Sequence, residues 1–189
     1  MRFSVRELAY LGLAGSLTLG VAVGLGTGLT VATGIPMIGG LLNAIVTAAL
    51  LTAGVKGVPR FGSGILLWVI MSSLAIPTLT MGPPGVHKIA IGIISGLVWD
   101  VLLTLLGRKT WSYMVSGAVM MLVVMFGVYA AAVILGLPGE ERIRKVIFYI
   151  IPINFGLGLF GTWLGLVLFN KTLSKTNFVR KMIEQQCRG

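Results

Sequence analysis

The hydrophobic positions of the chain form six long runs, each bounded by charged residues, proline or glycine. Each run has about the 20 apolar residues that a helix needs to cross the hydrocarbon core of a bilayer. Because lipid offers no partner to an open strand edge, such runs are predicted to be helices. The pattern therefore predicts an all-α, polytopic membrane protein: a six-transmembrane-helix bundle forming one domain over residues 1–189. The predicted spans cover residues 8–26, 36–55, 61–80, 86–106, 111–135 and 146–169.

The composition supports the same class. Hydrophobic residues make up 56% of the chain and charged residues 11%, whereas a soluble domain usually carries about 25% charged residues. The apolar excess is therefore expected to face lipid, and six spans leave little chain for a soluble catalytic domain. The first run is longer than the apolar core of a signal peptide, about 7–15 residues, and no Ala-x-Ala site follows it. We therefore expect it to be a span.

Lysine and arginine are distributed unevenly between the two sides that six spans would define. Eleven lie on one side and four on the other. By the positive-inside rule, the richer side is cytoplasmic. We therefore expect a multi-pass protein of the cell membrane with both termini in the cytoplasm. The four are Lys88, Arg142, Arg144 and Lys145, and the eleven are Arg2, Arg6, Lys56, Arg60, Arg108, Lys109, Lys171, Lys175, Arg180, Lys181 and Arg188.

The net charge of +10 comes from short basic clusters between apolar runs, without interleaved aromatic residues. This pattern favours contact with the anionic headgroups of the lipid bilayer and does not indicate a nucleic-acid partner. The basic cytoplasmic tail, residues 171–189, is predicted to be either a helix on the inner leaflet or an extension of the last span. Its apolar stripe consists of Phe178, Val179, Met182 and Ile183.

Motifs of common enzymes are missing from the sequence. It has no Walker loop, no HExxH and no GxSxG, and it contains one histidine and one cysteine, Cys187. Asp100 is the only acidic residue within a predicted span, so a relay between paired carboxylates is not expected. We therefore expect neither catalysis nor a metal, cofactor or disulfide.

Small residues recur every four positions in several runs. Gly12, Ser16 and Gly20 form a ridge in the first run, and Gly92 and Gly96 form a second ridge that leads to Asp100. Such ridges let helix backbones approach closely. They are predicted either to pack helices within this chain or to dock another membrane subunit, and the first run suits docking best.

Asp100 is the residue in the spans that most requires a partner. A charged side chain at the bilayer centre costs about 2.5–3.5 kcal/mol on the insertion scale. Arg108, Lys109 or a helix end could relieve this cost. The alternative interpretation is a role in coupling to a partner protein.

Polar residues in the outer half of the predicted bundle indicate an outward-facing pocket. His87 and Lys88 begin the fourth run, where helix N–H groups favour anions, although Lys88 could instead extend to lipid headgroups. Asn43, Thr80, Tyr129, Tyr149 and Asn154 also lie in the outer half and complete the predicted substrate-binding set.

The layout resembles a substrate-binding S component of an energy-coupling factor (ECF) transporter. The resemblance rests on six spans in 189 residues, the Gly12-x-x-x-Ser16-x-x-x-Gly20 ridge, and a proline- and glycine-rich outer loop before Gly92-x-x-x-Gly96-x-x-x-Asp100. It implies capture of a vitamin-like micronutrient, docking on a transmembrane coupling subunit, and ATP hydrolysis by separate ATPase subunits. The alternatives are a self-contained small transporter or channel, and a membrane scaffold protein without a ligand.

Overall fold

The computed structural model describes residues 3–33, 36–78, 80–81, 84–136, 140–177 and 179–180, without the side chains of residues 27, 29, 30, 33, 36–41 and 140–147. Every regular element in these ranges is a helix, which confirms the all-α class. The elements are α1 (Val5–Thr33), α2 (Pro36–Gly57), α3 (Ser63–Ala75), α4 (His87–Leu105), α5 (Thr110–Ile134), α6 (Glu140–Lys171) and the short 3-10 helix η1 (Leu173–Lys175).

Among the described residues, four helical segments are long and apolar enough to cross a membrane. They are Val5–Gly26, His87–Leu105, Thr110–Ile134 and Phe148–Lys175, and two shorter apolar helices cover Leu42–Gly57 and Ser63–Ala75. These helices support a multi-pass membrane protein, while the count of six spans stays a prediction.

Helix α3 is shorter than the predicted run over residues 61–80, because it ends at Ala75. Pro77 has no N–H group with which to continue the helical ladder. The N–H of Ile76 bonds instead to the carbonyl of Ser73 at 3.3 Å, which tightens the last turn. The chain from Ile76 onwards is therefore free to form the connection that leads to α4.

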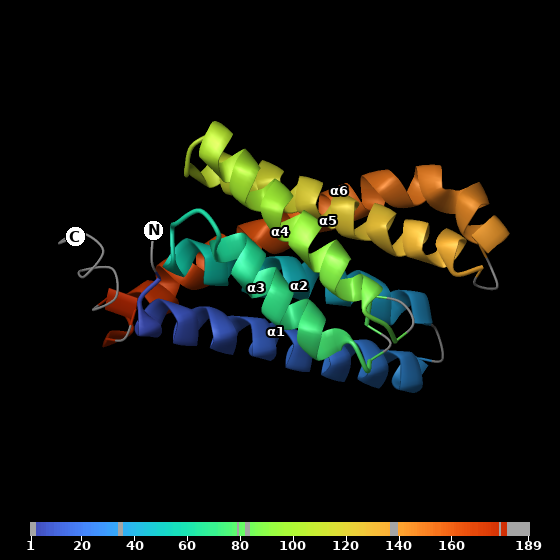
Figure 1. Ribbon diagram of the computed structural model, residues 1–189, viewed down its shortest axis with the longest axis horizontal. Helices are drawn as coiled ribbons and strands as arrows, with labels where there is room; N and C mark the ends of the chain where they lie inside the picture. The colour runs from blue at the N-terminus through green and yellow to red at the C-terminus, as the bar shows by residue number, and fades with distance from the viewer. Residues whose placement is uncertain are drawn as a thin grey trace.

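The helices pack as neighbours in a closed cycle, in the order α1, α2, α6, α5, α4, α3 and back to α1. Figure 1 shows them lying side by side along the long axis of the molecule. Helices that are distant in sequence, such as α2 and α6, therefore share one interface. This arrangement encloses the space in which the polar residues of the spans can meet.

Most of the basic residues of the described chain lie at one end of the bundle. This end holds the start of α1, the α2–α3 and α4–α5 connections and the end of α6 (Figure 1). It carries Arg6, Lys56, Arg60, Arg108, Lys109, Lys171, Lys175 and Arg180, whereas Lys88 lies at the other end. The side chains of Arg142, Arg144 and Lys145, together with all of Arg2, Lys181, Cys187 and Arg188, lie outside the described residues.

A capping box starts α1. The backbone N–H of Ser4 donates to Glu7 Oε2 at 2.7 Å, and the N–H of Glu7 donates to Ser4 Oγ at 3.3 Å. Glu7 also pairs with Arg60 of the α2–α3 connection at 3.1 Å. The contact ties the first helix to the basic end of the bundle.

The tail contributes to the core through Val179, which is buried. Leu173–Lys175 forms the 3-10 helix η1 after α6. The other residues of the predicted apolar stripe, Phe178, Met182 and Ile183, lie outside the described residues.

Candidate ligand-binding cavity

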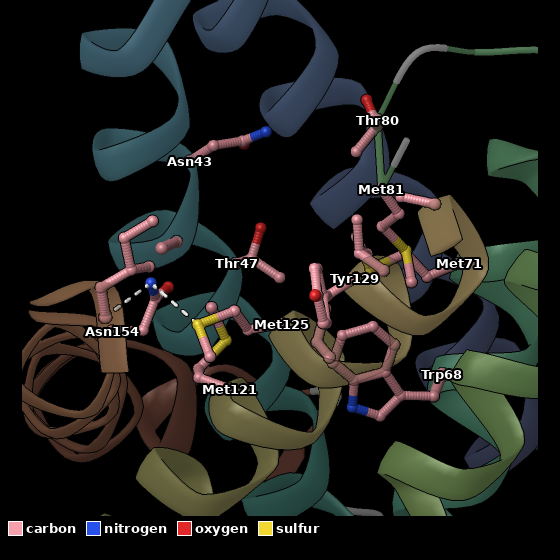
Figure 2. Close-up of a pocket in the computed structure, with 15 residues that line it drawn as sticks. Asn43, Thr47, Trp68, Met71, Thr80, Met81, Met121, Met125, Tyr129 and Asn154 are labelled. Carbon is pink, nitrogen blue, oxygen red and sulfur yellow. Dashed lines mark hydrogen bonds between the residues drawn. The ribbon is translucent and has the colours of Figure 1, made fainter. Parts of the chain in front are cut away.

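A cavity of about 330 Å³ lies among α2, α3, α5 and α6, with Thr80 and Met81 of the α3–α4 connection at its edge. It occupies the half of the bundle away from the basic end. Its size falls at the lower end of the range of about 300–1,000 Å³ for small-molecule pockets. Figure 2 shows polar side chains over an apolar wall of sulfur-containing and aromatic side chains, formed mainly by Trp68, Met71, Met81, Met121 and Met125.

Four of the seven predicted substrate-binding residues meet at this cavity. They are Asn43 of α2, Thr80, Tyr129 of α5 and Asn154 of α6. These residues are far apart in the sequence, and the cyclic packing of the helices brings them together. The two asparagines approach from neighbouring helices, since α2 packs on α6.

Thr47 is a cavity residue that the sequence reasoning missed. A threonine in an apolar helix usually bonds to its own backbone, as Thr52 does to the carbonyl of Ala48 at 2.6 Å. Thr47 is 7% exposed and lines the cavity. Within the described chain its hydroxyl makes no hydrogen bond. Its spacing of four residues from Asn43, on one face of α2, was the signal that could have found it.

The amide of Asn154 has a defined orientation. Its Nδ2 donates to the carbonyl of Ile150 at 3.2 Å and lies 3.6 Å from the sulfur of Met125 (Figure 2). Both amide hydrogens are thereby engaged. The carbonyl oxygen of the side chain is left as the hydrogen-bond acceptor that Asn154 offers to the cavity.

The structure does not bring His87, Lys88 or Tyr149 to the cavity. Tyr149 is 74% exposed on the outside of α6, and His87 lies in the first turn of α4, away from the lining. Lys88 neither extends toward headgroups nor forms an anion site. Its Nζ is buried and donates to the carbonyls of Ala75 at 2.9 Å and Thr78 at 2.5 Å. Lys88 therefore caps the end of α3, whose last carbonyls lack helical donors.

Asp100 is hydrogen-bonded to the N-terminal end of α3, and a helix end was one of the partners that the sequence analysis considered for it. Its carboxylate is buried and accepts three backbone N–H groups at the start of α3. The donors are Gly62 at 3.0 Å, Gly64 at 3.2 Å and Ile65 at 3.1 Å. The carboxylate thus replaces the missing acceptors of the first helical turn.

The two predicted docking ridges face different surroundings. Gly92 and Gly96 are buried against α3, where a Cβ on Gly96 would lie 2.6 Å from the Cα of Ile65. In the described chain these glycines and Asp100 are therefore buried in the α3–α4 interface, which favours the alternative that this ridge packs helices within the chain. On α1, a Cβ on Gly12 or Gly20 would meet nothing within 4 Å, and Ser16 is exposed. The ridge on α1 thus faces outward.

Comparisons with models of protein families, with curated proteins and with solved structures found no match for this chain. The class rests on the fold itself: an all-α protein with several apolar helices suited to a multi-pass membrane protein, and with a partly polar cavity in one half of the bundle.

Proposed function

We propose that the protein is the membrane-embedded substrate-capture subunit, or S component, of an ECF-type uptake transporter for a vitamin-like micronutrient. The observation that carries the proposal is the cavity, in which four polar residues predicted to bind substrate converge from α2, α5, α6 and the α3–α4 connection. A small, partly polar pocket is what a solute-capturing subunit requires.

The distribution of charge supports capture from outside. Most of the basic residues lie at one end, and the cavity lies in the half nearer the other end. Under the positive-inside rule the basic end is cytoplasmic. The cavity then belongs to the outer half of a six-span bundle in the plasma membrane, with both chain termini in the cytoplasm.

The outward ridge of α1 supports docking on a transmembrane coupling subunit. Gly12, Ser16 and Gly20 leave a smooth strip along which a foreign helix can approach closely. The same helix presents Leu13 and Leu17, 71% and 52% exposed, which supply apolar contact area beside the strip. Separate ATPase subunits would then supply the energy for uptake.

Thermal unfolding of the purified full chain against a panel of vitamins and their precursors tests capture. A ligand that binds only the native state stabilises it by about 2.7 kcal/mol at a hundredfold excess over Kd. A rise in Tm with one compound, lost in Asn154→Leu, supports the proposal. A Tm that no compound raises favours the scaffold alternative.

Co-purification of ATPase subunits from native membranes separates an S component from a self-contained transporter. The S component is expected to retain the ATPases through the coupling subunit. Ligand binding without any associated ATPase would instead favour the self-contained transporter.

A further inference from the structure

The described lining of the cavity contains no charged side chain. Lys88, the cation nearest in sequence to the α3–α4 edge, is buried and engaged with two backbone carbonyls. An ionised ligand would therefore lose its hydration without gaining a counter-charge from these residues, which is strongly unfavourable. The lining thus favours an uncharged ligand.

The apolar wall favours a flat ring. Trp68 and Tyr129 present aromatic surface, and aromatic groups pack well against one another in offset or edge-to-face geometry. The sulfurs of methionines also make favourable contacts with aromatic rings, and the flexible side chain adapts to the shape of the ring. Four methionines line the wall, from three parts of the chain: Met71, Met81, Met121 and Met125.

The polar groups define what the ring must carry. Asn154 presents an acceptor, because its two amide hydrogens are engaged with Ile150 and Met125. An acceptor at this point requires a donor on the ligand. Thr47 lines the same cavity (Figure 2), and its hydroxyl, which is unpaired within the described chain, can donate or accept there.

We propose that the cavity binds an uncharged molecule that consists of one or two flat aromatic rings and carries at least one N–H or O–H donor. This substrate class rests on the proposed substrate-capture function, and the volume of about 330 Å³ limits the ligand to this size. The donor meets the Asn154 carbonyl, and the ring lies against the methionines.

The test uses the full chain in lipid nanodiscs with ¹³C-methyl-labelled methionines. Four small probes are compared: benzamide is the reference, and each of the other three differs from it in one property. Benzamide is neutral, flat and a donor; benzoate is anionic; N,N-dimethylbenzamide lacks the donor; cyclohexanecarboxamide lacks the flat ring. Signals of the four cavity methionines report binding, while Met114 and Met120, which do not line the cavity, report the integrity of the fold.

Benzamide is expected to shift the cavity signals and to leave Met114 and Met120 unchanged. Benzoate should bind at least about tenfold more weakly, because its charge is unpaired. N,N-dimethylbenzamide should bind roughly tenfold more weakly than benzamide, because it leaves the Asn154 carbonyl without a hydrogen-bond donor. In the Asn154→Leu variant, benzamide and its dimethyl derivative should bind with the same affinity. Unchanged Met114 and Met120 signals would show that this variant is still folded.

Several results would overturn the proposed class. One is that benzoate binds as tightly as benzamide. Another is that all four probes bind equally well, as expected if they only partition into a space filled by lipid chains. A third is that benzamide fails to shift the cavity signals at its solubility limit. Capture itself is judged separately, from the vitamin panel and the ATPase co-purification. A vitamin that raises Tm while benzamide fails would preserve the function and reject this ligand class.

Discussion

Lys88 and Asp100 lie twelve positions apart on α4 and cap the two ends of α3. At 1.5 Å per residue this separation is about 18 Å, which matches the 13 residues of α3. The ammonium of Lys88 meets the carbonyl end of α3 and the carboxylate of Asp100 meets its N–H end. Each charge is therefore of opposite sign to the end of the helix dipole that it contacts, which is favourable. This pairing explains how two ionisable residues are buried between apolar helices.

Replacing Asp100 by Ala is expected to lower stability by about 3 kcal/mol, because three backbone N–H groups at the start of α3 lose their charged acceptor. Thermal unfolding in detergent measures the loss. Thr104→Val is the matched control on the same helix, since it removes a single bond to the Asp100 backbone carbonyl. Equal Tm changes for the two variants would contradict the capping role of the carboxylate.

Lys88→Met is expected to destabilise the protein by about 2 kcal/mol, because the carbonyls of Ala75 and Thr78 lose a charged donor. The same change should weaken ligand binding, since Thr78 leads directly into the Thr80–Met81 edge of the cavity. Thermal unfolding with and without the captured compound measures both effects. His87→Ala, at the neighbouring position and outside the cavity lining, should change neither the stability nor the ligand affinity. A similar loss of stability in both variants would argue against the capping role of Lys88.

The glycine ridges predict opposite responses to an added methyl group. Gly96→Ala is expected to cost about 1–3 kcal/mol, because the new Cβ meets the backbone of Ile65 at 2.6 Å. Gly20→Ala should be neutral or stabilising by up to about 1 kcal/mol, because its site is open and alanine favours the helix. Unfolding temperatures of the two variants decide whether the α4 ridge packs internally while the α1 ridge does not.

Ser16→Leu or Gly20→Leu is expected to leave folding and ligand binding intact but to abolish association with the proposed coupling subunit. The bulky side chain would disrupt the close approach of a foreign helix along α1. ATPase co-purification measures the association, and Ala130→Leu on the exposed face of α5 is the control for added bulk. Retention of ATPases at the normal level by both α1 variants would remove the docking role from this ridge.

Thr47→Val is expected to weaken ligand binding without lowering Tm, because the lost hydroxyl has no partner in the described chain. Thr52→Val provides the contrast, since it removes a bond to Ala48 and should leave binding unchanged while costing about 1 kcal/mol. Thermal shifts with and without the captured compound separate the two effects. A Tm loss in Thr47→Val as large as in Thr52→Val would indicate a structural role for Thr47 instead.

The sequence alone determined which segments become helices and which residues are candidates for the cavity. Runs of apolar residues predict helices in lipid whatever their neighbours, and the helices α2, α4 and α5 begin and end within two residues of the predicted runs. Asn43 and Asn154 could be identified as costly in lipid, and Tyr129 as a polar residue of the outer half, before any packing was known. The Ser4–Glu7 capping box was not predicted, although its Ser-x-x-Glu spacing is the signal that could have found it.

Only the tertiary structure decided which face of each helix turns inward. In a soluble helix the apolar stripe marks the buried face, but these helices are apolar on all sides, because lipid and core are both nonpolar. Similar small-residue ridges therefore face outward on α1 and inward on α4. The roles of Lys88 as a cap and of Thr47 as a cavity residue also depend on helix packing. Lys88 reaches the end of α3 only because α3 and α4 are neighbours, and the cavity forms only where several helices meet.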